Sequence, residues 1–88
     1  MVFAVSNYVM SITFTLQGKQ HDLTQEQVVA RLRGVRPEAA RSLLVEIGGA
    51  EYPVKQALSV AIGADRADFI SHQARSIFIR LGFTVRRV

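Results

Sequence analysis

The sequence predicts an α+β fold, in which three to four short helices pack on one small sheet. Apolar residues alternate with polar ones in some segments, as in strands, and recur at helical spacing in others. The length of 88 residues is that of one domain, and a hydrophobic content of 49% argues against disorder. The expected strands lie near residues 11–17, 43–47, 50–52 and 83–88.

The start of the chain is apolar and uncharged. We expect residues 1–9 to form a tail or an extra strand, and residues 10–88 to form a single small domain. No Lys or Arg precedes Lys19, so this run lacks the charged region of a signal peptide, and it is too short to span a bilayer. The chain has no cysteine, which excludes a disulfide scaffold and a thiolate zinc site. We therefore expect a cytoplasmic protein without a membrane partner.

The first expected strand shows the alternation most clearly. Ile12, Phe14 and Leu16 occupy every second position between polar residues, which predicts a half-buried strand. Gly18 and Lys19 then predict a turn.

The first expected helix has a strong start signal. Thr24 and Gln27 have the spacing of a capping box, in which each side chain satisfies the backbone N–H of the other residue. Gly34 predicts the end of this helix. Pro37 suits the first turn of a further short helix near 37–41.

A β-hairpin is expected in the middle of the chain. Its strands, 43–47 and 50–52, are separated by Gly48 and Gly49, which can adopt the positive φ angles of a tight turn. Pro53 lacks a backbone N–H, so the second strand has to end there.

Two helices and a strand are expected at the end. The first helix, 54–62, closes at Gly63, and the second, 71–81, begins with Ser71 as its N-cap and is followed by the strand. The inward stripe of the second helix is Ile70, Ala74, Ile77, Phe78 and Leu81. This order resembles a helix-turn-helix followed by the start of a wing, and a plain helix pair is the alternative interpretation.

The net charge of +4 is concentrated in the last quarter of the chain. Up to Asp65, six Lys and Arg residues cancel six Asp and Glu residues. From Arg66 onward, five arginines are opposed by Asp68 alone. Such asymmetry favours a polyanionic partner.

The last helix supplies the candidate nucleic-acid contacts, because its outward face carries side chains that bind phosphates and base edges. We expect a small DNA-binding module with phosphate contacts from the arginines and a lysine, and with a glutamine and a histidine nearer the bases. The candidate residues are Lys55, His72, Gln73, Arg75, Arg80, Arg86 and Arg87. Because side chains alternate along a strand, at most one of the last two arginines should share a face with the helix.

A protein-interaction module is the alternative from another class. Ile79 is an apolar residue among cations and could meet an acidic protein partner or a second copy of the chain. No HExxH or GxSxG motif and no close pair of acids occurs in the sequence, so we expect neither catalysis nor a metal or cofactor.

One further motif resembles a known family. The pattern G-x-x-Y-P-x-K from Gly49 to Lys55, followed by L-G-F at 81–83, resembles the core of the sulfur-binding domains of modification-dependent restriction endonucleases. Those modules recognise phosphorothioate-modified DNA. The resemblance implies that Tyr52 and Pro53 help to line an apolar pocket for the backbone sulfur, and Gln56 stands where those domains carry an alanine.

Overall fold

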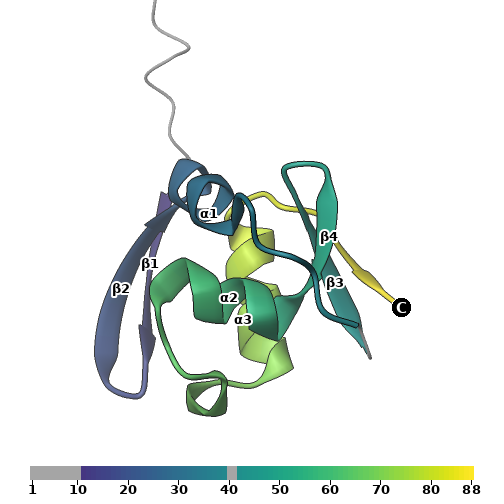
Figure 1. The fold of residues 1–88 in the computed structure, drawn as a ribbon. Coiled ribbons are helices and arrows are strands. Elements are labelled where there is room, and N and C mark those ends of the chain that lie inside the picture. The colour runs from purple at the N-terminus through teal and green to yellow at the C-terminus, as the bar shows by residue number, and fades with distance from the viewer. Residues whose placement is uncertain (1–10, 40–41) are drawn as a thin grey trace, which may run out of the picture.

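The computed structural model describes residues 11–39 and 42–88, and its fold is α+β as predicted. Two helices, α2 and α3, lie between two small antiparallel sheets, and α1 lies across one end of the helix pair (Figure 1). The elements in chain order are β1 (Ser11–Leu16), β2 (Lys19–Thr24), α1 (Gln25–Leu32), β3 (Leu43–Ile47), β4 (Ala50–Pro53), α2 (Val54–Ile62), the 3-10 helix η2 (Arg66–Asp68), α3 (Ser71–Arg80) and β5 (Val85–Arg87).

The first sheet is a two-stranded hairpin whose second strand, β2, was not expected. β1 pairs antiparallel with β2, and Gln17 and Gly18, with φ of 51° and 73°, form the turn between them. The sequence of β2 lacks an alternating apolar pattern, because Leu23 is its only apolar residue. Leu23 is also the only fully buried side chain of this strand. The predicted turn is therefore correct at Gly18, whereas Lys19 already belongs to a strand.

Helix α1 begins where the sequence predicts. The Oγ1 atom of Thr24 accepts from the Gln27 N–H at 3.0 Å, and the Oε1 atom of Gln27 accepts from the Thr24 N–H at 3.1 Å. Both halves of the capping box are thus formed. The helix ends at Leu32, and Gly34 follows with a φ of 81°.

The expected short helix near 37–41 is wrong over the residues that can be described. Residues 35–39 form neither helix nor strand, and residues 40 and 41 lie outside the description. The side chain of Gln56 hydrogen-bonds the backbone at Arg36 and at Glu38, so this segment satisfies polar groups through a distant residue. The residues around Pro37 carry no local signal for this partner, because Gln56 is 18 to 20 residues away in the sequence.

The second sheet has three strands in the order β4-β3-β5, all antiparallel. Gly48 and Gly49 make the predicted hairpin turn with φ of 59° and 86°. The expectation of one sheet is wrong, because β1 pairs with β2 and not with these strands. An alternating pattern predicts that a strand has a buried face, but it does not specify the neighbouring strand.

Helix α2 spans its predicted range, and α3 begins at Ser71 as predicted but has a different N-cap and ends at Arg80. Ile70, not Ser71, is the N-cap of α3. Ile70 is also 59% exposed, so it does not belong to the inward stripe, and Phe69 is buried in its place. The rest of the stripe is confirmed as buried: Ala74, Ile77, Phe78 and Leu81. These side chains join residues from both sheets and all three α-helices in one core.

The helix pair is not joined by a short turn. Residues 63–70, which include η2, connect α2 to α3. β5 pairs with β3, which precedes α2, so it is an edge strand of the three-stranded sheet. Among the residues described, no helix combines the length and the apolar character needed to cross a membrane. The expected tail or strand at residues 1–9 lies outside the described residues.

Candidate nucleic-acid interface

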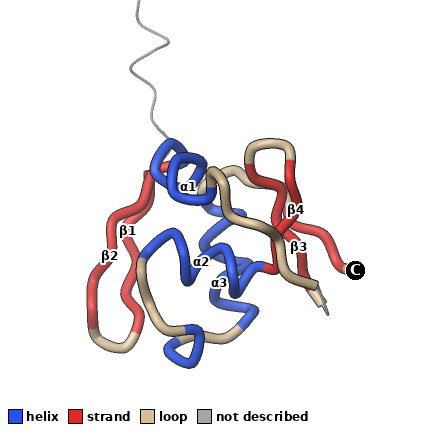
Figure 2. The backbone as a smooth tube through the Cα atoms, viewed as in Figure 1, coloured by secondary structure: helices blue, strands red, loops and turns tan. Residues whose placement is uncertain are grey.

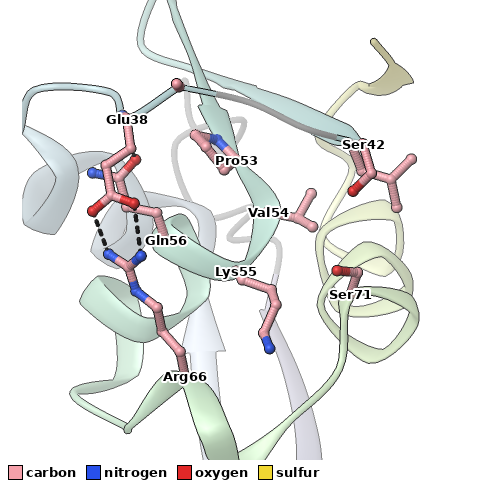
Figure 3. Close-up of a pocket in the computed structure, with 10 residues that line it drawn as sticks. Glu38, Ser42, Pro53, Val54, Lys55, Gln56, Arg66 and Ser71 are labelled. Atoms are coloured by element: carbon pink, nitrogen blue, oxygen red, sulfur yellow. Dashed lines mark hydrogen bonds and ion pairs between the residues drawn. The ribbon is translucent and has the colours of Figure 1, made fainter.

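The start of α2 and the start of α3 meet at a cavity of about 290 Å³, which we call the α2–α3 cavity (Figure 3). It is lined by residues from the α1–β3 loop, β3, both helix starts and η2: Glu38, Ala39, Ser42, Leu43, Pro53, Val54, Lys55, Gln56, Arg66 and Ser71. Backbone N–H groups in the first turn of a helix lack partners within the helix and carry partial positive charge. The cavity therefore lies where two such helix ends come together.

Lys55 is the cationic side chain from the first turn of α2. It is half-buried, and in Figure 3 it lies between Arg66 and Ser71 on the cavity wall. Its Nζ atom is 5.8 Å from the centre of the Phe69 ring, within the range of a cation–π contact. The N-cap of α2 is Pro53, which provides no side-chain hydrogen bond to the first turn. Lys55 is thus held at a helix start that has no side-chain cap.

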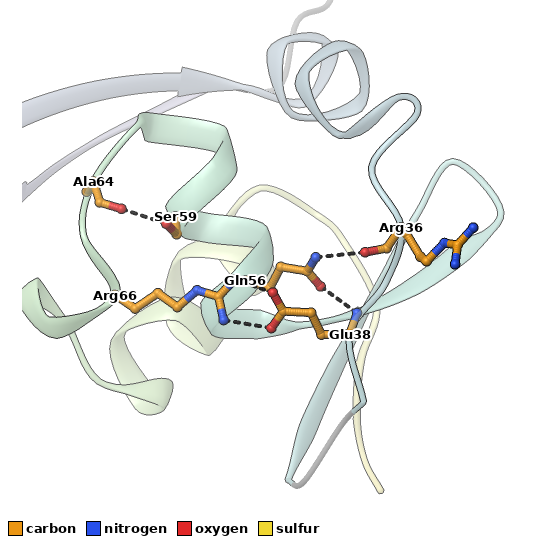
Figure 4. Close-up of polar contacts among 6 residues, drawn as sticks. All are labelled: Arg36, Glu38, Gln56, Ser59, Ala64 and Arg66. Atoms are coloured by element: carbon orange, nitrogen blue, oxygen red, sulfur yellow. Dashed lines mark hydrogen bonds and ion pairs between the residues drawn. The ribbon is translucent and has the colours of Figure 1, made fainter.

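Gln56 fixes one wall of the cavity and was not among the predicted site residues. It is 4% exposed; its Nε2 atom donates to the Arg36 carbonyl at 2.9 Å, and its Oε1 atom accepts from the Glu38 N–H at 3.0 Å (Figure 4). The α1–β3 loop therefore runs past the start of α2 in a defined position (Figure 2). The available sequence signal for a structural role of Gln56 was its position next to the apolar residue Ala57. The backbone partners of Gln56 are far away in the sequence and could not be inferred from it.

A bidentate ion pair crosses the cavity wall. Arg66 donates from Nη1 to Glu38 Oε1 at 2.6 Å and from Nη2 to Glu38 Oε2 at 2.5 Å (Figures 3 and 4). These hydrogen bonds lower the pKa of Glu38 and raise the pKa of Arg66. Both side chains remain close to half exposed, at 48% and 46%. Sequence reasoning missed the pair, because 28 residues separate its members.

Arg75 and Arg87 do not line the cavity, but each is a neighbour of a residue that does. Arg75 is exposed and lies one helical turn beyond Ser71, on the same side of α3. Arg87 is directly opposite Leu43 in the β3–β5 pairing, so both side chains lie on the helix-facing side of the sheet. Leu43 and Ser71 both line the cavity.

Arg86 lies on the other side of the same sheet, which we call the outer face. It donates from Nε and Nη2 to the carboxylate of Glu51 at 2.6 Å and 2.8 Å. These hydrogen bonds lower the pKa of Glu51 and raise the pKa of Arg86. Neighbouring arginines of β5 are therefore separated by the sheet, in agreement with the alternation expected along a strand.

The remaining predicted residues of α3 are exposed but differ in their contacts. The Oε1 atom of Gln73 accepts from the Ile70 N–H at 2.9 Å, so this side chain helps to start the helix. Arg80 reaches β1, where its Nη2 atom donates to the Thr13 carbonyl at 3.3 Å. His72 is exposed in the first turn, close to the cavity end of the helix.

Tyr52 and Pro53 face different cavities. Pro53 lines the α2–α3 cavity, whereas Tyr52 lines a separate cavity of about 280 Å³ between α1 and the β3–β4 hairpin. The hydroxyl of Tyr52 donates to the Leu32 carbonyl at 3.2 Å, and its ring is buried. The apolar part of the α2–α3 cavity therefore comes from Pro53 with Leu43 and Val54. Within residues 11–39 and 42–88, no group of His, Asp and Glu side chains has an arrangement that could hold a metal ion.

Comparison with known proteins gives a family. A family model described as SCO5918-like matches residues 17–88. The chain belongs to the SCO5918-like family. No curated protein and no solved structure matched the chain. The segment shared with the SCO5918-like family includes every residue that lines the α2–α3 cavity, and it begins just after β1.

Proposed function

We propose that this member of the SCO5918-like family is a small DNA-binding module that places the α2–α3 cavity against the sugar–phosphate backbone. The observation that carries this proposal is that two helix starts and Lys55 line one cavity, while Arg75 and Arg87 lie on the adjoining faces of α3 and of the sheet. Lys55 comes from α2, Arg75 from α3 and Arg87 from β5. Helix starts and guanidinium groups are the standard protein partners of phosphate oxygens.

The pairing of the arginines narrows the predicted set of contacts. Arg86 is engaged by Glu51 on the outer face, and Arg80 is tied to β1. Lys55, Arg75 and Arg87 are therefore the first candidates for phosphate contacts, and Arg80 could add one by leaving its single bond to Thr13. His72 and Gln73, in the first turn of α3, are the candidates for base edges. The proposal is of a binding module and not an enzyme, without a cofactor and located in the cytoplasm.

The test is the dependence of DNA affinity on salt. A fluorescently labelled duplex is titrated with the protein at several KCl concentrations, and single-stranded DNA and RNA of the same sequence are titrated in parallel. Each phosphate contact contributes about one unit to the slope of log K against log salt. Lys55→Gln, Arg75→Gln and Arg87→Gln should each lower that slope by about one unit and weaken binding to all sequences alike.

Arg86→Gln is the matched control, because it removes the same charge from the neighbouring position of β5 on the outer face. It should leave the slope close to that of the parent protein. Equal losses for Arg86→Gln and Arg87→Gln would show that only net charge matters and that the cavity is not the interface. A parent protein without salt-sensitive binding to any of the nucleic acids would refute the proposal.

Recognition of a modified backbone is a second candidate. Leu43, Pro53 and Val54 give the cavity an apolar wall beside Lys55, and a sulfur atom is less strongly hydrated than a phosphate oxygen. A duplex with one phosphorothioate linkage would then bind more tightly than the unmodified duplex, and Pro53→Ala should reduce the difference. Equal affinity for the two duplexes leaves general DNA binding as the function.

Exposed apolar surface favours a protein partner as the alternative. Ile79 is 44% exposed on α3, two residues before the buried Leu81. An acidic protein, or a second copy of the chain, could bind this residue and the neighbouring arginines. Such an interface would be less sensitive to salt than DNA binding, and Ile79→Ala would weaken it while leaving DNA affinity unchanged.

A further inference from the structure

At the candidate DNA site, the cationic side chain of Arg66 is already engaged by the carboxylate of Glu38. Both residues line the α2–α3 cavity, and Lys55 lies next to them (Figure 3). The carboxylate of Glu38 accepts two parallel hydrogen bonds from the guanidinium group of Arg66. A phosphate presents two oxygens to arginine in the same way.

A phosphate should displace the Glu38 carboxylate from Arg66 at a small cost in free energy. The two side chains are 48% and 46% exposed, and exposed ion pairs contribute little to stability because water and salt screen them. The backbone of Glu38 is held separately, since its N–H donates to Gln56. The carboxylate can therefore move away without release of the loop that carries it.

We propose that Arg66 is a phosphate-binding residue that Glu38 occupies in the free protein and that the DNA backbone takes over. This inference rests on the proposed function and adds a competing carboxylate to it. Glu38 then weakens binding to any polyanion and favours a ligand that places a phosphate within reach of both Arg66 and Lys55.

The experiment measures DNA affinity and salt slope for Glu38→Gln, Arg66→Gln and the double variant, with circular dichroism to confirm that each variant is folded. Glu38→Gln should bind the duplex about threefold to tenfold more tightly and raise the slope by about one unit, because Arg66 becomes available. Adding Arg66→Gln to that variant should remove both gains. Arg66→Gln in the parent protein should change the slope much less than Arg66→Gln does in the Glu38→Gln protein.

The outer face provides a matched pair. Glu51 and Arg86 have the same bidentate geometry but lie on the opposite side of the sheet from the cavity. Glu51→Gln, alone or with Arg86→Gln, should therefore leave the slope unchanged. This comparison separates release of an arginine at the interface from a general loss of negative charge.

The outcomes also separate this inference from the proposed function. If Arg66→Gln has no effect on affinity or slope in the Glu38→Gln protein, while Arg75→Gln still lowers both, Arg66 is not a phosphate contact and DNA binding stands. Equal gains from Glu38→Gln and Glu51→Gln would likewise overturn the inference. Absence of DNA binding by the parent protein overturns both proposals.

Discussion

Gln56 is the side chain on which the position of the cavity wall depends. It is buried, and it bonds one backbone carbonyl and one backbone N–H in the loop before β3. Buried polar groups need such partners, and all buried side-chain polar atoms among the described residues have one. The same two bonds satisfy backbone groups on either side of Pro37, where the expected helix does not form.

Gln56→Ala should lower the free energy of unfolding by about 1–3 kcal/mol, because two hydrogen bonds are lost and their backbone partners are left without a protein partner. Urea denaturation measures this change. The amide hydrogen of Glu38 should also exchange faster with solvent. Gln20→Ala, at an exposed position of β2, is the control and should be close to neutral. Equal stability of the two variants would show that the loop does not depend on Gln56.

The outer-face ion pair gives a prediction on pH. The hydrogen bonds from Arg86 lower the pKa of Glu51 below its ordinary value of 4.5. The stabilisation by this pair is therefore present above that value and is lost as the pH falls through the lower pKa of the folded state. Thermal melts should show a small advantage of the parent protein over Glu51→Gln at neutral pH, and the advantage should vanish in acid. A difference that grows on acidification would contradict the pairing.

The N-caps of α1 and α3 show when a local sequence pattern is sufficient to predict the start of a helix. Thr24 and Gln27 are three residues apart, and the bonds between them need nothing from the rest of the chain, so α1 could be placed from the sequence. Ser71 had the right residue type for an N-cap, yet it is the first residue of the helix and the N-cap is Ile70, one residue earlier. Burial of Phe69 fixes the chain there, and that burial depends on tertiary packing.

Thr24→Ala should lower the free energy of unfolding by about 1 kcal/mol through loss of the cap. Chemical denaturation of the two proteins gives this value directly. Thr84→Ala, at an exposed position before β5, is the matched threonine control. If both substitutions cost the same, the capping box does not contribute to stability.

At the scale of the molecule, the core was predictable and the arrangement of the sheets was not. The buried face of α3 follows from its apolar spacing, because Ala74, Ile77 and Phe78 recur at helical intervals. β2 was missed because it is mostly polar, and the partner of β1 was therefore misassigned. The cavity could not be predicted, since its walls come from segments as far apart as Glu38 and Ser71.

Phe78→Ala should cost about 3–5 kcal/mol, because the side chain is fully buried and packs edge-to-face against Phe83 with ring centres 5.9 Å apart. A loss of this size is comparable to the whole stability of many small domains. Ile79→Ala, at the next position but exposed, should change stability by about 0.5 kcal/mol or less. A thermal or urea melt of both variants decides whether α3 is oriented as described.

The hydrogen bond from Tyr52 to Leu32 provides an optical signal for one part of the fold. The chain has two tyrosines and no tryptophan, and Tyr8 lies outside the described residues. In a Tyr8→Phe protein, the tyrosine absorption and emission bands would come from Tyr52 alone. Because its hydroxyl donates to the last residue of α1, a change in that spectrum would record the separation of α1 from the β3–β4 hairpin. Partial opening at this end of the molecule would then be visible without any attached dye.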